Sequence, residues 1–415
     1  MSKLGELIQK FCPNGVDYVS LDTVCQISKG TQLNKTDMRK MGSYPVINGG
    51  VNPSGYIEQF NQSENTITIS QGGASAGYVN WITTKFWAGA HCYILVPTEK
   101  VVKRYLFHFA KSQEYKLQEC QYGEGIPALA KTSITSLEIP LPPLEVQREI
   151  VRILDSFTEL TAELTAELTA RKKQYEFYRD KLLDFAGNTD VKNVPLGDIA
   201  KFVYGYTDKA KETGSVRFVR ITDISEDGRL NPYDEKYVEL TDESKKYLLK
   251  KGDLLLARTG ATYGKTLYFE EDEPAVYASF LIKIILDNSV IKNRYYWHFS
   301  KSSLYWEQAE RYVSKGGQQQ FNTNAVSRVI VPIPSLEVQD RIIYVLDNFD
   351  AICSDLNIGL PAEIEARQKQ YEYYRDSLLT FAACGNTIEQ TDRQTDRQTD
   401  RQTDRQTDRQ TDRPD

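Results

Sequence analysis

The chain has 415 residues, of which 40% are hydrophobic and 26% charged, and a formal net charge of −6. No apolar run approaches the roughly 20 residues that cross a bilayer, and the first residues lack a signal-peptide core, so we expect a cytoplasmic chain outside the membrane. Six scattered cysteines and only three histidines argue against a Cys/His metal cluster and favour buried free thiols.

Residues 1–141 predict a domain that mixes strands and helices. The β-branched and aromatic runs at 66–70 and 92–96 predict strands, and residues 102–120 predict a helix. This segment carries 13 basic and 11 acidic side chains. That balance permits nucleic-acid binding without indicating it, because DNA affinity depends on where individual Lys and Arg residues lie.

Residues 142–190 predict a long helix with a coiled-coil seam. Apolar residues recur at steps of four and three, as the a and d positions of a heptad do. The seam has two polar exceptions and consists of Ile150, Leu154, Phe157, Thr161, Leu164, Leu168, Arg171, Tyr175, Tyr178 and Leu182.

Residues 191–335 predict a second mixed domain, and residues 336–385 a second helical segment. In the domain, residues 253–257 predict a strand and residues 292–312 a helix. Gly359 and Pro361 predict that the second helical segment kinks or restarts there. Its seam comprises Ile342, Leu346, Phe349, Cys353, Leu356, Leu360, Ile364, Arg367, Tyr371, Tyr374 and Leu378.

An internal repeat relates the two halves of the chain. L-E-V-Q occurs at 144–147 and 336–339, and K-Q-Y-E-[FY]-Y-R-D occurs at 173–180 and 369–376. A weaker match joins residues 104–112 to residues 294–302. The order is therefore variable domain, helix, variable domain, helix. Two matched seams favour an antiparallel helix pair, and the alternative is two helices that each pack on their own domain.

Two motifs suggest catalysis, but we interpret them as one repeated turn. Residues 73–77, G-A-S-A-G, match a hydrolase nucleophile elbow, and residues 260–266, G-A-T-Y-G-K-T, resemble a phosphate-binding loop. The second motif is one residue short and runs into a predicted strand. Because Ser75 aligns with Thr262 within the repeat, we predict a Gly-rich turn that occurs twice. No N-P-P-Y methyltransferase motif, S-adenosylmethionine loop or acidic nuclease cluster is evident.

Over roughly residues 1–385, this arrangement resembles the specificity subunit of type I restriction–modification enzymes. The run T-A-E-L-T-A-E-L within residues 160–170 resembles a short repeat of some family members. The resemblance implies an α+β fold with two mixed α/β target recognition domains, at 1–141 and 191–335. Helical spacers at 142–190 and 336–385 would separate them and pack as an antiparallel coiled coil with pseudo-two-fold symmetry.

The resemblance also implies a non-catalytic subunit that reads a bipartite, asymmetric sequence in double-stranded DNA. Its partners would be two adenine-methyltransferase subunits and motor-nuclease restriction subunits. This chain would bind no cofactor or metal, and S-adenosylmethionine is expected on the methyltransferase partner. The repeated helical motif contains the residues expected to bind a partner, namely Tyr175, Tyr178, Arg179, Tyr371, Tyr374 and Arg375.

Polar residues in Gly-rich loops are the candidates for DNA contact, since base edges and phosphates are read by such side chains. In the first domain they are Lys29, Thr31, Gln32, Lys35, Gln71, Ser75 and Lys131. In the second domain they are Tyr206, Lys209, Arg258, Thr262, Lys265, Lys315, Gln318, Gln319 and Gln320. The domains differ outside their shared motifs, so we expect different half-sites.

Residues 386–415 form a separate tail, in which T-D-R-Q repeats five times from residue 391. It has almost nothing apolar to bury, and we predict disorder. A repeated ACAG unit would encode it, and slippage by one unit would shift the reading frame, so we hypothesise phase-variable expression. A twelve-base repeat, which keeps the frame, is the alternative.

Two other functions compete with DNA recognition. One is an interaction scaffold without DNA, with two ligand-binding domains on a coiled coil, and the other is an enzyme that uses the Gly-rich turns. Salt-dependent binding to one bipartite duplex would separate DNA recognition from both.

Overall fold

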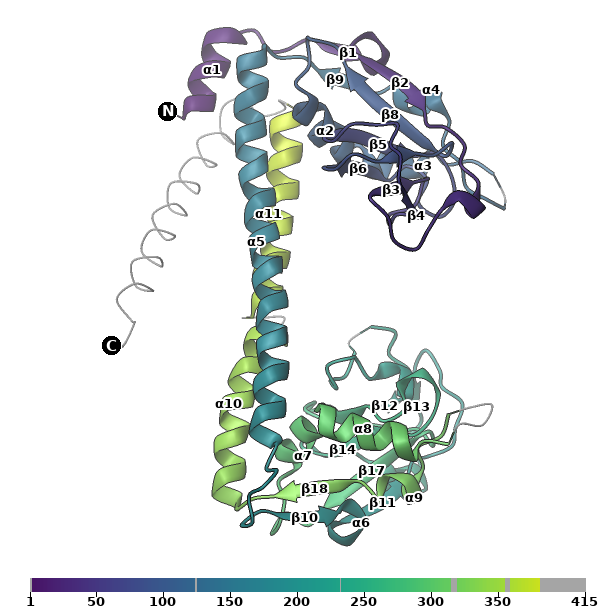
Figure 1. The fold of residues 1–415 in the computed structure, drawn as a ribbon, viewed down its shortest axis with the longest axis vertical. Helices are drawn as coiled ribbons and strands as arrows, with labels where there is room; N and C mark the ends of the chain where they lie inside the picture. The colour runs from purple at the N-terminus through teal and green to yellow at the C-terminus, as the bar shows by residue number, and fades with distance from the viewer. Residues whose placement is uncertain (1, 124, 232, 315–318, 355–358, 381–415) are drawn as a thin grey trace. The chain divides into compact units, whose positions relative to one another are not determined.

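The computed structural model describes residues 2–123, 125–231, 233–314, 319–354 and 359–380. The predicted tail at 386–415 lies outside the described residues. The chain divides into two compact units (Figure 1). The first runs to Glu163 and resumes at Glu365, and the second spans Leu164–Ile364.

The first unit contains a β-rich domain between a short helix and a long one. Its helices are α1 (Lys3–Phe11), α2 (Lys103–Ser112), α3 (Glu114–Glu119), α4 (Lys131–Thr135) and the start of α5 (Leu144–Leu183). Its strands are β1 (Tyr18–Ser20), β2 (Cys25–Lys29), β3 (Tyr44–Ile47), β4 (Gly55–Ile57), β5 (Thr66–Ser70), β6 (Val79–Ile82), β7 (Trp87–Ala88), β8 (Cys92–Pro97) and β9 (Glu138–Pro140).

The second unit repeats this plan. Its strands are β10 (Lys192–Pro195), β11 (Ala200–Tyr204), β12 (Val216–Val219), β13 (Tyr237–Val238), β14 (Leu254–Ala257), β15 (Thr266–Tyr268), β16 (Ala275–Tyr277), β17 (Leu281–Leu286) and β18 (Ile330–Ile333). Its helices are α6 (Leu196–Ile199), α7 (Asn293–Phe299), α8 (Ser303–Tyr312), α9 (Thr323–Val326) and α10 (Leu336–Ser354). The helix α11 (Leu360–Thr380) begins here, and most of it belongs to the first unit.

The two β-rich domains share one sheet topology. The four-stranded sheets have the orders β2-β8-β5-β6 and β11-β17-β14-β15, and the three-stranded sheets β4-β3-β7 and β13-β12-β16. In each three-stranded sheet a single pairing is parallel, β3 with β7 and β12 with β16. The weak sequence repeat therefore corresponds to a repeated fold.

The predicted strands are confirmed, whereas each helix predicted between the sheet and the spacer is two helices. The strand β5 is buried along its whole length, as expected for a run of Thr and Ile. The helix predicted at 102–120 ends after Ser112, and α3 restarts at Glu114. In the second unit, the Ser302 side chain accepts a hydrogen bond from the Tyr305 backbone N–H and begins α8 as a separate helix.

Each unit pairs a part of α5 with a helix from the second spacer, and the two run in opposite directions (Figure 1). In the first unit the Phe157 ring stacks on Tyr374 of α11, with centroids 5.2 Å apart. In the second, the Tyr178 ring stacks on Phe349 of α10 at 5.6 Å. These are seam residues, so the predicted helix packing is confirmed. The predicted restart is also confirmed, because Gly359 lies outside any helix and α11 begins at Leu360.

The L-E-V-Q motif joins each spacer helix to its preceding domain. The Gln147 side chain is fully buried, and its Oε1 accepts from the Val102 backbone N–H at 2.8 Å, at the start of α2. Its Nε2 donates to the backbone oxygens of Lys100 and Pro142. Gln339 makes the equivalent bonds to the start of α7. The motif thus replaces the side-chain cap that both helices lack.

The described cysteines are all free thiols, but they are not all buried. Cys12, Cys25, Cys92 and Cys353 are buried, whereas Cys120 at the end of α3 is exposed, and Cys384 lies outside the described residues. Within the described ranges, no helix is long and apolar enough to span a bilayer.

Candidate nucleic-acid interface

Three loops meet at one end of the four-stranded sheet in the first domain. They follow β2, connect β5 to β6, and precede β8, whose ends are adjacent in the strand register. The Gly30 backbone N–H donates to the Cys92 oxygen at 3.0 Å, and that of Gln71 donates to the His91 oxygen at 2.9 Å. A fourth segment joins them, because the Leu129 N–H donates to the Gln71 oxygen at 2.7 Å.

The second domain has the same four segments and the same backbone bonds. The Gly205 N–H donates to the Leu281 oxygen at 3.1 Å, and the Arg258 N–H donates to the Phe280 oxygen at 3.1 Å. The Phe321 N–H donates to the Arg258 oxygen at 2.7 Å. We name this arrangement the loop edge, formed by residues 29–32, 71–78, 89–91, 122–123 and 125–129 in the first domain and by residues 204–206, 258–265, 278–280 and 319–321 in the second.

A glycine at the same position of each loop edge explains why the frame is shared. A Cβ added to Gly30 would lie 2.3 Å from the Ala88 backbone oxygen, and one on Gly205 would lie 2.3 Å from that of Ala278. Only glycine allows the backbones to approach this closely. The side chains beside these glycines therefore start from equivalent positions in both domains.

The Gly-rich turns are confirmed as one element that occurs twice. Gly73 and Gly260 have positive φ angles of 79° and 74°, and Gly77 and Gly264 have 88° and 80°. Each turn connects two antiparallel strands, β5 to β6 and β14 to β15. The second turn leads into a strand and not into the helix that a phosphate-binding loop needs.

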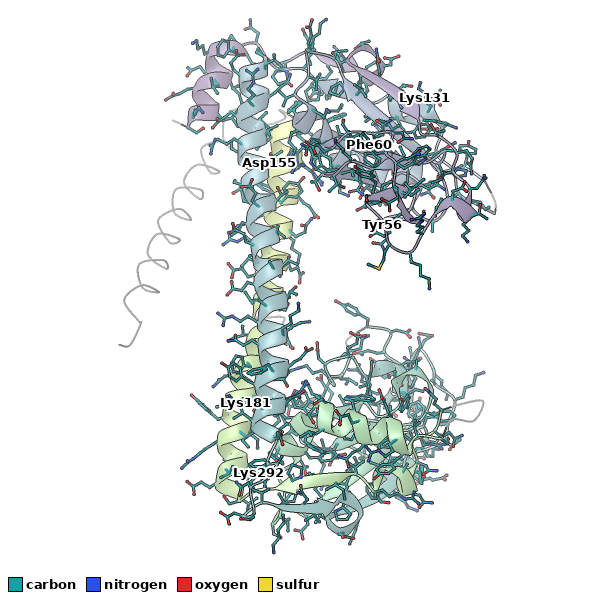
Figure 2. The ribbon with its side chains drawn as sticks, in the orientation of Figure 1. Tyr56, Phe60, Lys131, Asp155, Lys181 and Lys292 are labelled. Carbon is teal, nitrogen blue, oxygen red and sulfur yellow. The ribbon has the colours of Figure 1, made fainter. Side chains whose placement is uncertain are left out.

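The candidates of the first domain divide between the loop edge and its surroundings. Lys29, Thr31, Gln32, Gln71 and Ser75 lie on the loop edge, with Lys29, Thr31 and Gln32 exposed. Lys35 is exposed in the turn at 35–37, and Lys131 is exposed at the start of α4 (Figure 2). The structure brings the five loop-edge candidates together and places Lys35 and Lys131 outside the loop edge.

In the second domain, the loop edge gathers Tyr206, Arg258, Thr262, Lys265, Gln319 and Gln320. The Tyr206 ring packs against Tyr247, with centroids 5.6 Å apart. Lys265 lines a cavity of about 360 Å³ beside Lys172 and Arg179 of α5. Lys209 is exposed beyond the frame. The candidates Lys315 and Gln318 lie outside the described residues.

Sequence reasoning missed three residues of the loop edge, namely His91, Tyr204 and Phe280. Tyr204 is equivalent to Lys29, and Phe280 to His91, by their backbone bonds to the adjacent strands. All three side chains are exposed. The weak alignment of the two halves around Gly30 and Gly205 is the signal that could have found Tyr204.

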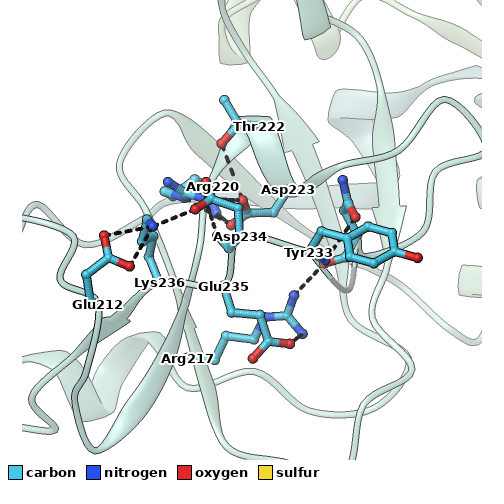
Figure 3. A network of polar contacts seen from close by, with 10 residues as sticks. Glu212, Arg217, Arg220, Thr222, Asp223, Tyr233, Asp234, Glu235 and Lys236 are labelled. Carbon is cyan, nitrogen blue, oxygen red and sulfur yellow. Dashed lines mark hydrogen bonds and ion pairs between the residues drawn. The ribbon is translucent and has the colours of Figure 1, made fainter. Parts of the chain in front are cut away.

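Several cations of the second domain are held by carboxylates and serve the fold. Arg217 of β12 pairs with Glu235 at 3.0 Å, and Arg220 pairs with the buried Asp223 at 2.7 Å (Figure 3). Lys236 contacts Glu212 at 2.9 Å and also Asp234. These side chains hold the β12–β13 region and are poor candidates for phosphate contact.

A buried Tyr–His–Asp chain fixes the helices to each domain, and we call it the helix joint. In the first unit, His108 of α2 lies 2.8 Å from Asp155 of α5 through Nε2 and 2.9 Å from the Tyr371 hydroxyl through Nδ1 (Figure 2 labels Asp155). Arg104 donates to the same Asp155 oxygen at 2.7 Å. Because a carboxylate only accepts, Nε2 carries the proton and Nδ1 accepts from the tyrosine.

The second unit has the same joint with the repeats exchanged. His298 lies 2.8 Å from Asp347 of α10 and 3.2 Å from the Tyr175 hydroxyl of α5. Tyr175 belongs to the first copy of the helical motif and packs on the second domain, whereas Tyr371 belongs to the second copy and packs on the first domain. Burial lowers the pKa of His298 to about 4, outweighing the opposing effect of Asp347, so the imidazole is neutral.

Acidification from pH 7 to pH 5 is expected to destabilise the second unit by about 2 kcal/mol through His298. The pKa of about 4 lies below the ordinary value of 6.5, so the unfolded chain binds a proton that the folded imidazole does not. The contribution is complete above pH 6.5 and is lost as the pH falls towards 4.

Urea unfolding measures this loss. With Trp81 and Trp87 changed to Phe, the fluorescence of Trp297 and Trp306 reports on the second unit. His298→Gln should flatten the pH dependence between 7 and 5. Equal slopes for this variant and its parent would contradict the prediction.

The residues predicted to bind a partner mostly lie within the helix packing. Tyr175, Arg179, Tyr371 and Tyr374 are buried, and Tyr178 is about one third exposed. Arg179 and Arg375 pair with the adjacent Asp180 and Asp376 at 2.9 and 2.8 Å. Partner binding by these six residues stays a prediction. The aromatic residue between the two tyrosines of each motif copy is more exposed. Phe177 is 61% exposed and Tyr373 is 56% exposed.

No group of three or more His, Cys, Asp or Glu side chains could hold a metal ion in the part of the chain that the structure describes. The two loop edges offer hydrogen-bond donors and acceptors on a shared backbone frame. They therefore suit recognition of a ligand surface.

Comparisons with known proteins agree on one family. The model of the type I restriction modification DNA specificity domain matches residues 13–171 and again 188–366. A putative type I restriction enzyme specificity subunit of Haemophilus influenzae is 33% identical over 390 residues, which cover 88% of this chain and 96% of the relative. The EcoR124I/EcoR124II specificity subunit of Escherichia coli is 30% identical, over 72% of this chain and 77% of the relative.

Solved structures share the fold. The crystal structure of a type I restriction-modification S subunit from Mycoplasma genitalium has a TM-score of 0.56 at 21% identity, covering 88% of this chain and 97% of that one. A chain from a structural study of type I complex assembly and conformational transition has the same TM-score at 17% identity, covering 88% and 98%.

Proposed function

The chain belongs to the type I restriction–modification DNA specificity family, and from this premise we propose that each domain reads one half of an asymmetric, two-part sequence in double-stranded DNA. The subunits of this family supply non-catalytic DNA recognition to the complex. The recognition domains are residues 1–141 and 191–335, and the spacers are residues 142–190 and 336–385. The element bounds support this division, since β9 ends at Pro140 and α5 begins at Leu144.

The observation that carries the proposal is one backbone frame with two sets of side chains. The loop edges share their glycines and backbone bonds, yet Lys29, Gln71 and His91 of the first correspond to Tyr204, Arg258 and Phe280 of the second. A common frame sets where a reading side chain starts, and different side chains read different base edges. Two unequal half-sites follow.

We further infer that two adenine-methyltransferase subunits bind, one to each half of the repeat, and that motor-nuclease subunits join this core. The exposed Phe177 and Tyr373, which occupy the same position of the repeated motif, support two equivalent docking points. S-adenosylmethionine then binds the methyltransferase subunits. This role belongs in the cytoplasm, where the DNA is.

The purified chain alone is expected to methylate, cleave and hydrolyse nothing. Adding the methyltransferase partner and S-adenosylmethionine should produce methylation of one bipartite sequence.

Exchanging residues 191–335 for those of a relative should then change one half-site only, because the first loop edge is untouched. Methylome sequencing reads both halves.

The alternative functions predict other results. If the exchange changed both half-sites, the two domains would not read DNA independently. Activity of the isolated chain that Ser75→Ala abolishes would favour an enzyme. An absence of sequence-specific binding in the presence of the methyltransferase would favour a scaffold without DNA.

A further inference from the structure

The backbone of Arg258 is fixed on both sides at the centre of the second loop edge. Its N–H donates to the Phe280 oxygen at 3.1 Å, and its oxygen accepts from the Phe321 N–H at 2.7 Å. It directly follows the buried strand β14, whose four residues are fully covered. The starting point of the side chain is therefore set by three segments at once.

The guanidinium group is also held, by two aromatic rings and one hydrogen bond. Its central carbon lies 5.3 Å from the centroid of the Tyr204 ring and 5.3 Å from that of Phe280. Its Nε donates to the Ser279 backbone oxygen at 3.2 Å. Contacts with two rings restrict the planar group, and the Nε bond sets its rotation.

Arg258 is itself partly exposed at the loop edge. The Tyr204 and Phe280 side chains are 42% and 51% exposed, so the group lies at the surface and not in the core. Among the described residues, Arg258 makes no ion pair, whereas Arg217, Arg220 and Arg294 each contact a carboxylate. No carboxylate of the described residues therefore pairs with its two Nη groups.

A fixed pair of Nη donors matches one base edge in the major groove. Guanine presents two acceptors there, O6 and N7, and arginine contacts them with two parallel hydrogen bonds. Gln71 holds the equivalent position in the first domain, with a different set of donors and acceptors. We propose that Arg258 reads a guanine in the second half-site, with Tyr204 and Phe280 as its positioning residues.

This inference rests on the proposed function and names the base that one residue reads. A phosphate contact is the competing role, and lysine distinguishes the two. Lysine keeps the charge that a phosphate needs, but it lacks the planar fork and the Nε bond to Ser279. Arg258→Lys should therefore weaken the base preference if a base is read, and should leave it unchanged if only a phosphate is bound.

The test uses the full chain with its methyltransferase partner and a library of duplexes randomised across the second half-site. The wild-type complex should prefer guanine at one position by about tenfold or more. Arg258→Ala should reduce that preference to near none, Arg258→Lys should weaken it, and both should leave the first half-site unchanged. The retained half-site shows that each variant is folded. Phe280→Ala should weaken the same preference in part.

Gln71→Ala is the matched control, because it changes the equivalent residue of the other domain. It should leave the guanine preference intact. A second half-site without guanine, unchanged preference in both Arg258 variants, or a uniform loss of methylation without a change of preference would each overturn the inference. If the wild-type complex shows no bipartite target at all, the proposed function itself fails.

Discussion

Inserting one Thr-Ala-Glu-Leu unit after Leu168 is expected to abolish methylation of the original target and to create a new one. The unspecified gap between the half-sites should grow by one or two base pairs. The insertion falls within α5, whose Leu144 and Leu183 ends belong to different units. Four residues lengthen a helix by about 6 Å, and DNA rises roughly 3.4 Å per base step.

The helix should tolerate this insertion because the seam is nearly kept. Four residues advance the helix by slightly more than one turn of about 3.6 residues, which leaves the apolar face close to its original direction. The second spacer already differs in this way, since Leu336 and Tyr371 are four residues further apart in sequence than Leu144 and Tyr175. Thr-Ala-Glu-Leu also consists mostly of good helix formers.

Methylome sequencing of a strain that carries the insertion measures the result. Both half-sites should be unchanged, because neither loop edge contains the inserted residues. Replacing Thr165–Leu168 by a different four-residue helical sequence is the control for composition and should leave the gap unchanged. A gap of the original length in the insertion variant would show that α5 does not set it.

Asp350→Ala is expected to destabilise the second unit by about 3–5 kcal/mol. The Asp350 side chain is 2% exposed, and its carboxylate pairs with Lys301 at 3.0 Å and with Arg229. Burial alone would raise the pKa of this carboxyl, but the two cations outweigh burial and lower the pKa. Removing the carboxylate leaves Lys301, only 13% exposed, without its counter-charge.

The internal repeat provides a matched control for this variant. Thr158 occupies the equivalent position in the first spacer, where its hydroxyl donates to the Asp155 backbone oxygen at 2.9 Å. Thr158→Ala should change stability by less than about 1 kcal/mol, because it leaves no buried charge without a partner. Urea unfolding compares the two: the fluorescence of Trp297 and Trp306 follows Asp350→Ala in the second unit, and that of Trp81 and Trp87 follows Thr158→Ala in the first. A loss of under 1 kcal/mol for Asp350→Ala would contradict the assigned role.

The periodic and repeated features of the chain could be predicted from sequence because they depend on local spacing. The heptad positions became buried helix contacts, such as Phe157 against Tyr374. The alternation of motifs predicted two similar domains, and the alignment of Gly73 with Gly260 predicted a shared turn. The Gly359 and Pro361 pair marked the helix restart, because proline suits only the first turn of a helix.

The partners of buried polar residues could not be predicted, because they depend on which segments pack together. The Tyr175 hydroxyl, for example, contacts His298, 123 residues further along the chain. Similarly, Tyr204 and Phe280 carry no motif of their own, and only the fold places both rings close to Arg258. Neither contact leaves a pattern in sequence spacing.

The exchanged helix joints constrain how the two halves of the gene can diverge. Each histidine is completed by a tyrosine encoded in the other half, His108 by Tyr371 and His298 by Tyr175. A substitution of the tyrosine in one spacer therefore affects the domain that is encoded in the other half. Covariation across a family alignment should accordingly link opposite halves at these positions. Residues of the loop edges can therefore change independently in the two halves, whereas residues of the helix joints must change together.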